Sequence, residues 1–273
     1  RGGIQNVRYR TPKGTPPNLG MAVRLSFPDG RDTATGHYAF EIVPEKGYGF
    51  RVRREQCRLR KPSGAVSWFE RVGDDFRTSA PGLKPFLEPQ ALALPVAGGV
   101  MEFSPMVKAI SSMRSCSIEP SLVREPQEPE VGATLRPDGN NVASVLSDLQ
   151  RQAGEEFEQL KDFLNAIVPG IEELGPVMHG KKISLSFTQR WNERGRVRFE
   201  AFNMSDGTLR AVGILAAIFQ RQKPSLLAIE EPEATLHPGA LQIILDAIRM
   251  GASRFQVVLT THTLLDTETG GDN

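Results

Sequence analysis

Hydrophobic and polar residues alternate along the first part of the chain, which is the pattern of half-buried β-strands. The alternation is clearest in four stretches: MAVRLSF, HYAFEIV, FRVRREQCRLR and VSWFERV. Turn-forming residues such as Gly47 and Gly49 separate them. Successive strands of this kind predict an antiparallel meander.

The pattern changes to a helical spacing between residues 138 and 170. Asp138 or Asn141 can cap a helix there, and the spacing predicts one long helix or two joined helices. The positions that mark its apolar face are Val142, Val145, Leu146 and Leu149. The proline-rich stretch SIEPSLVREPQEPEVG, just upstream, predicts an irregular connector. Two short strands, KISLSF and RVRFEAF, are expected downstream.

The last seventy residues have the strongest pattern. GTLRAVGILAAIFQ is apolar almost all round and predicts a buried helix. SLLAI and FQVVLTT are continuous apolar runs, and GALQIILDAIRM between them has the spacing of an amphipathic helix. This order predicts a right-handed βαβ unit in a parallel sheet that is covered on both faces.

Composition narrows the class of protein only slightly. The 273 residues are 39% hydrophobic, and 33 Lys and Arg stand against 32 Asp and Glu. A basic run lies at residues 51–61, but strand alternation would divide it between two faces, so we favour a solvated sheet face over a DNA-facing patch. Cys57 and Cys116 are the only cysteines and form no metal motif, which fits a reducing cytoplasm. The apolar runs are too short to cross a bilayer, so we expect no membrane partner.

Two carboxylates follow the first apolar strand directly, and polar residues follow the second. Glu230 and Glu231 are expected at the same sheet edge as Thr260, Thr261 and His262. Ligands of open α/β sheets bind beyond the carboxyl ends of the strands. Adjacent strand residues point in opposite directions, so one glutamate is expected to face a metal and the other a nucleophile. This division suits phosphoryl transfer.

A short turn before the buried helix offers a complementary anion site. Ser205, Asp206 and Gly207 precede a helix that is expected to begin near Thr208. A helix N-terminus presents unpaired N–H groups, and a glycine lets a phosphate approach closely. Ser205 can add a hydroxyl donor.

Three motifs in this order resemble those of a known family. MSDGTLR, LLAIEEPEATLHP and VVLTTH resemble the signature motif, the Walker B motif with its D-loop, and the switch histidine of ABC-type ATPase heads, in the branch of RecF, SMC-like and OLD-like proteins. LRPDGNNVASVL is also similar to that branch. The resemblance implies a P-loop α/β head with a parallel core: a β-rich lobe (1–100), a helical insertion (101–182) and a catalytic lobe (183–273).

The resemblance also implies roles. Glu230 would hold Mg²⁺ through water, Glu231 would be the general base, and His262 would contact the γ-phosphate of ATP. Ser205, Asp206 and Gly207 would contact ATP held by a second copy, and residues 232–237 would face that copy in a homodimer. Three residues depart from the commonest pattern: Asp206 replaces Gly, Thr208 replaces Gln and Glu230 replaces Asp.

A phosphate-binding Walker A loop is missing from this pattern. GPVMHGKK is a near match, but Lys182 replaces the required hydroxyl residue and the run leads into a strand. A turn at Gly180 explains it better. In the family the loop lies near the N-terminus, so we expect it upstream of Arg1 and expect the chain alone to bind ATP poorly.

Several alternatives stay open. We favour a loop role for His237, and a metal site of Glu230, Glu231, Glu233 and His237 lacks a recognised spacing. Arg210 is either a sensor of the partner's nucleotide or a surface charge.

The main functional hypothesis is a cytoplasmic ATPase head that serves DNA repair or maintenance, or phage defence, with DNA as a candidate partner. The second is a nucleotide-gated module that controls a partner nuclease or toxin. A nuclease in its own right is the third, but no Toprim domain fits after His262.

Overall fold

The chain forms two compact units in a computed structural model that describes residues 18–29, 31–45, 49–192 and 195–261. Contacts divide it into an N-terminal unit, residues 1–111, and a C-terminal unit, residues 112–273. We expected three parts with boundaries after residues 100 and 182. In the structure, the segment from 112 to 182 packs into the same core as the C-terminal strands instead of standing apart as an insertion.

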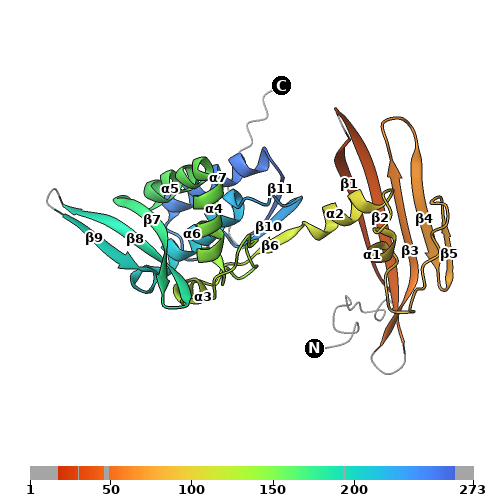
Figure 1. The fold of residues 1–273 in the computed structure, drawn as a ribbon, viewed down its shortest axis with the longest axis horizontal. Helices are drawn as coiled ribbons and strands as arrows, with labels where there is room; N and C mark the ends of the chain where they lie inside the picture. The colour runs from red at the N-terminus through yellow and green to blue at the C-terminus, as the bar shows by residue number, and fades with distance from the viewer. Residues whose placement is uncertain (1–17, 30, 46–48, 193–194, 262–273) are drawn as a thin grey trace. The chain divides into compact units, whose positions relative to one another are not determined.

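The N-terminal unit is built on a five-stranded antiparallel sheet in the order β1-β2-β3-β4-β5, which confirms the predicted meander (Figure 1). The strands are β1 (Leu19–Asp29), β2 (Asp32–Pro44), β3 (Phe50–Arg60), β4 (Val66–Val72) and β5 (Asp75–Thr78). Two helices follow, α1 (Leu94–Ala97) and α2 (Ser104–Ser111). The inner face of the sheet packs Cys57, Leu59 and Phe69 against Phe103 and Met106 of the helical segment. The opposite, outer face carries exposed residues, among them Arg24, Arg58 and Trp68.

A buried carboxylate joins the inner face to the first helix. Glu55 of β3 is fully buried and accepts hydrogen bonds from the backbone N–H groups of Ala93 (2.5 Å) and Leu94 (2.8 Å) and from the Tyr38 hydroxyl (2.9 Å). The carboxylate of Glu55 thus satisfies two backbone N–H groups at the start of α1. Burial nevertheless raises the pKa of Glu55 above its usual value.

The basic run on β3 was expected to divide between the two faces of the strand, and this expectation is wrong. The register between β2 and β3 shifts between Glu41 and Ile42, which leaves Arg53 as an extra residue. A β-bulge of this kind resets the alternation. Arg51 and Arg54 are therefore both exposed, on either side of the bulge, as are Arg58 and Arg60 further along.

The C-terminal unit contains a small parallel sheet in the order β11-β10-β6. Its strands are β6 (Arg114–Cys116), β10 (Leu226–Glu230) and β11 (Gln256–Thr260), and α7 (Pro238–Ala252) connects β10 to β11. The predicted parallel βαβ unit is confirmed. Coverage on both faces is not, because β11 is an edge strand whose Val258 is 43% exposed.

Helices enclose the core of this unit. The sequence predicted one long helix or two joined ones, and two are found, α4 (Val142–Gln152) and α5 (Gly154–Ile167). The helix α6 (Asp206–Phe219) is buried from Thr208 to Phe219 except at Arg210, as its continuous apolar pattern predicted. The proline-rich connector contains a short helix, α3 (Pro120–Arg124), because its first proline occupies the N-terminal turn, where no N–H is needed.

A second antiparallel sheet completes the unit, in the order β7-β8-β9. Its strands are β7 (Ile171–His179), β8 (Lys182–Asn192) and β9 (Gly195–Glu200), followed by the 3₁₀ turn η2 (Ala201–Asn203). The sequence did not reveal β7. The near-match to a phosphate loop lies in the β7-β8 hairpin, with Gly180 at a φ of 61° in the turn. A turn there was the favoured interpretation.

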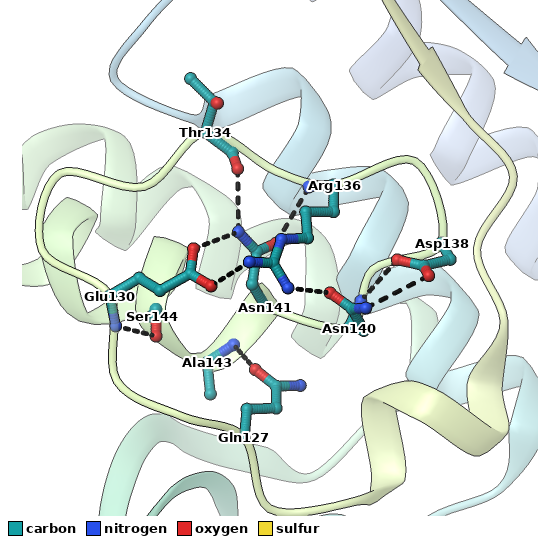
Figure 2. A network of polar contacts seen from close by, with 9 residues as sticks. All are labelled: Gln127, Glu130, Thr134, Arg136, Asp138, Asn140, Asn141, Ala143 and Ser144. Atoms are coloured by element: carbon teal, nitrogen blue, oxygen red, sulfur yellow. Dashed lines mark hydrogen bonds and ion pairs between the residues drawn. The ribbon is translucent and has the colours of Figure 1, made fainter.

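The LRPDGNN stretch forms a loop that is held by its own polar side chains (Figure 2). Asn141 is buried: its Oδ1 accepts from the Arg136 N–H (2.9 Å), and its Nδ2 donates to the Thr134 carbonyl (2.9 Å). Arg136 in turn contacts Glu130 and Asn140. Asn141 precedes α4 but makes no side-chain cap bond, so neither predicted capping residue acts as expected there. The network instead fixes the loop that leads into α4.

None of the helices in the described part of the chain is long and apolar enough to cross a membrane. Both cysteines are buried and free.

Candidate functional site

The two glutamates lie where β10 ends, but their backbones differ. Glu230 is the last residue of the strand and is exposed, and its carboxylate forms no hydrogen bond or ion pair with other described residues. Glu231 has a φ of 44°, and its N–H donates to the Thr260 carbonyl at 2.9 Å. Because Glu231 has left the extended conformation, strand alternation does not determine the direction of its side chain. The expectation that Glu230 and Glu231 point in opposite directions is therefore not supported by strand geometry at this residue.

A hydrogen bond attaches the loop after Glu231 to the end of β11. The Thr261 hydroxyl donates to the Glu233 carboxylate at 2.5 Å, which links the loop to the end of β11. Thr235 has a φ of 64°, an uncommon conformation for a residue with a branched side chain. The loop is thus a tightly turned segment between β10 and α7.

His237 ends this loop and caps α7. Its Nδ1 accepts a hydrogen bond from the Gly239 N–H at 3.2 Å, while the side chain is exposed. Capping α7 is a sufficient structural role for His237, and it supports the loop role that we favoured. The described residues contain no group of three or more His, Cys, Asp or Glu side chains that could hold a metal ion.

The start of α6 is capped by Ser205. Its Oγ accepts from the Thr208 N–H at 3.2 Å and lies 2.8 Å from the Thr208 hydroxyl. The second residue of the turn, Asp206, forms an ion pair with Arg124 at 2.6 Å, and Arg124 also donates to the Met204 carbonyl at 3.1 Å. The start of α6 is therefore tied to the end of α3. Nothing in the sequence indicated this partner, because 82 residues separate Arg124 from Asp206.

Gly207 brings the two halves of the candidate site together. A Cβ at this position would lie 2.7 Å from the Thr235 carbonyl oxygen and 3.8 Å from the Leu236 side chain. The residues of the predicted signature motif thus pack against the predicted D-loop of the same chain. The close approach gives Gly207 a structural reason of its own, and the phosphate contact that we expected at this residue stays a prediction.

Arg210 lies in the first half of α6. It is half-buried, and its Nε is buried without a hydrogen-bond partner among the described residues. Burial raises the pKa of the Cys116 thiol to about 12; the positive charge of Arg210 opposes this shift and the negative charge of Glu230 adds to it. Arg210 and Glu230 therefore both act electrostatically on Cys116, which pairs with Ile229 in the sheet. Arg210 is therefore not simply an exposed surface charge, which was one of the two alternatives.

The structure thus places five of the six predicted site residues in one unit, on segments that contact one another or share a strand end. They are Glu230, Glu231, Ser205, Asp206 and Gly207. His262 lies outside the described residues, so its predicted role is not tested by the geometry.

Comparison with family models identifies the C-terminal unit. Residues 110–265 match the family described as "AAA domain, putative AbiEii toxin, Type IV TA system". The chain belongs to this family. The match covers the loop of Figure 2, α6, β10 and β11, and it confirms the resemblance to an ABC/AAA-type ATPase head.

Individual relatives of this AAA domain are distant. The phosphate import ATP-binding protein PstB of Ehrlichia ruminantium (strain Gardel) is 28% identical over 128 residues, which are 42% of this chain and 49% of PstB. The matched region thus spans about half of that relative.

Solved structures are related only weakly. The SMC head domain from Thermotoga maritima has a TM-score of 0.35 at 10% identity and covers 84% of this chain and 65% of its own. An SmcHead bound to the C-winged helix domain of ScpA has a TM-score of 0.43 at 10% identity, covering 85% of this chain and 67% of its own.

Proposed function

We propose that this AAA domain hydrolyses ATP with Mg²⁺ and works as a homodimer that encloses the nucleotide. The observation that carries the proposal is the contact of Gly207 with the Thr235 carbonyl. It joins the start of α6 to the loop that follows the two glutamates. The hydrogen bond from Thr261 to Glu233 brings the end of β11 to the same loop.

The residues present fit a divalent metal and a phosphate chain. Glu230 offers an exposed carboxylate with no other commitment among the described residues, and carboxylate oxygens are preferred ligands of Mg²⁺. Bound Mg²⁺ would neutralise phosphate charge. In this proposal Glu230 holds the metal through water, and Glu231 orients and deprotonates the attacking water.

The start of α6 would serve the nucleotide of the second copy. Ser205 is exposed and its Oγ is held in place by Thr208, so it can donate to a phosphate without rearranging the helix. Asp206 is neutralised by Arg124, which reduces the repulsion that an acid at this position would exert on an anion. His262 is assigned to the γ-phosphate by the motif alone.

The decisive experiment replaces Glu231 with Gln in the protein expressed from its natural reading frame. Loss of the general base should lower the rate of ATP hydrolysis by roughly 10²–10⁴-fold, while dimers that form with ATP accumulate on size-exclusion chromatography. The matched control is Glu128→Gln, which removes an exposed acid of the same unit. Hydrolysis by Glu231→Gln at the wild-type rate would show that the assigned role is wrong.

A second candidate function is favoured by the family's description as a putative toxin of a toxin–antitoxin system. In it, slow nucleotide turnover gates a partner nuclease or toxin. Turnover measured alone, with DNA and with the product of the neighbouring gene separates the two: a head that serves DNA repair or phage defence should respond to DNA, and a gating module to the partner protein.

A further inference from the structure

The outer face of the sheet in the N-terminal unit carries a row of basic residues that the ATPase motifs do not use. Strand register places Arg24 opposite His37, His37 opposite Arg58, and Arg58 opposite Trp68. Neighbouring strands lie about 4.8 Å apart, so this row crosses roughly 14 Å of the sheet. Arg60 lies in the adjacent row, opposite Thr35.

Most of the arginines near one end of this face form ion pairs, and those at the other end form none within the described part of the chain. Arg53 pairs with Glu41 (3.5 Å), Arg54 with Glu70 (2.9 Å) and Arg77 with Asp75 (2.8 Å). By contrast, the three arginines at the other end form no ion pair or side-chain hydrogen bond within the described ranges. These are Arg24, Arg58 and Arg60. Three arginines without an ion pair among the described residues therefore lie near one another at this end, whereas Arg51 alone lacks one at the other end.

The surface is hollowed at the same place. A hollow of about 680 Å³, which we call the basic hollow, is lined by the three unpaired arginines, His37 and two hydroxyl residues, Ser26 and Thr35. A second hollow of about 300 Å³ adjoins it through His37 and Arg58 and is lined by Trp68 and Glu70. Trp68 is 39% exposed, although it is among the largest apolar side chains of the unit. Cationic groups, hydroxyl donors and an aromatic ring thus line one continuous depression.

We propose that the basic hollow binds single-stranded nucleic acid, an activity that does not depend on the proposed ATP hydrolysis. Arg24, Arg58 and Arg60 contact the phosphates of the strand, because guanidinium groups donate two hydrogen bonds to a phosphate. The ring of Trp68 stacks on one base next to this track, in the arrangement that sequence-tolerant single-strand binders use.

The form of the surface favours a single strand over other polyanions. Bases in a duplex already stack on each other, so Trp68 would find no free base face there. An anionic membrane is approached by protruding residues, whereas these arginines line a depression. The ligand that uses both the charges and the aromatic ring is an unpaired strand.

The test measures binding of a fluorescently labelled oligothymidylate by anisotropy as the salt concentration is varied. Three phosphate contacts predict a slope of log K against log salt of about −2 for a single strand, or an affinity loss of about 20-fold between 50 and 200 mM salt. Arg58→Ala should weaken binding about tenfold at low salt and reduce the slope by about 0.7. Arg77→Ala lies on the same sheet, but its charge is already paired, so it is the matched control and should bind like the wild type.

Trp68 provides an independent check. Trp68→Ala should weaken binding roughly 5- to 150-fold without changing the salt slope, and Trp68→Phe should recover most of the loss. Thermal unfolding verifies that each variant is folded. Equal affinity for a duplex, binding to phosphatidylserine vesicles but not to the oligonucleotide, or wild-type binding by Arg58→Ala would each overturn the proposal. The rate of ATP hydrolysis is measured on the same variants, so that a loss of nucleic-acid binding can be distinguished from a loss of ATPase activity.

Discussion

The two units of this chain display their polar chemistry in different ways. In the N-terminal unit, alternation along antiparallel strands directs polar residues to one sheet face, so Arg24, Arg58 and Trp68 are exposed within their strands. In the C-terminal unit, β10 buries Leu227 and Ile229 and shows a charged residue only at its end. A strand that is packed into a core can offer chemistry only where it stops.

The difference teaches where each kind of ligand can be held. A broad face suits a polymer that makes several equivalent contacts, and losing one of them weakens binding moderately. A strand end suits a small group that is held by a few residues, and losing one of them abolishes a chemical step. The largest effect we expect in this protein is therefore the loss of hydrolysis in Glu231→Gln, followed by the binding losses on the basic hollow.

Glu55→Ala tests whether the N-terminal unit depends on its buried charge. The change leaves the N–H groups of Ala93 and Leu94 without their acceptor and should lower the free energy of unfolding of this unit by roughly 3 kcal/mol. Hydrogen exchange should rise in β2–β4 and stay unchanged in α6 and β10. Glu102→Ala, an exposed acid of the same unit, is the control.

The same residue gives the unit a pH dependence. Because burial raises the pKa of Glu55, the unfolded chain releases this proton more readily, and stability should fall as pH rises above about 4.5, the value of an exposed glutamate. Glu55→Gln should remove that slope. If exchange in the C-terminal unit rises equally in Glu55→Ala, the two units are not independent.

Gly207→Ala tests the packing of the candidate site in the C-terminal unit, since it adds a methyl group without changing charge. The new methyl group meets the Thr235 carbonyl and should cost about 1–3 kcal/mol of stability, with a lower rate of hydrolysis because the loop is displaced. The matched control is Gly154→Ala at the start of α5, where an added Cβ meets nothing within 4 Å. Equal melting temperatures for the two variants would contradict the close contact.

Arg124→Ala should have the smallest effect. Its partner Asp206 is 58% exposed, so the ion pair is screened by solvent and should contribute under about 1 kcal/mol. A double-mutant cycle with Asp206→Ala measures this coupling directly. A coupling above about 2 kcal/mol would mean that α3 and α6 form one rigid element, and one near zero would mean that Asp206 is free to meet a ligand.

Much of the local structure could be predicted from the sequence. The meander, the two joined helices, the buried α6 and the β10-α7-β11 unit each have a periodicity that is long enough to identify the element. The turn at Gly180 was predicted because the residues that follow it lead into a strand, whereas the strand before it, β7, was not recognised. The family motifs were recognisable because each follows or precedes such an element directly.

The missed features have physical reasons. The strand β6 has only three residues and exists because β10 pairs with it, so it has no pattern of its own. The arginines of β3 were wrongly divided between two faces because a single bulged residue, Arg53, resets the alternation. The hydrophobic pattern of the sequence does not show where such a bulge lies.

The sequence by itself determined most of the longer helices and strands and which residues carry the ATPase motifs, because these depend on contacts within a few residues. Only the tertiary structure decided that Gly207 meets Thr235, that Arg124 neutralises Asp206, and that Arg24 and Arg58 lie in one row. These contacts join residues far apart in the chain. Their energies come from packing and charge in three dimensions, which no local pattern records.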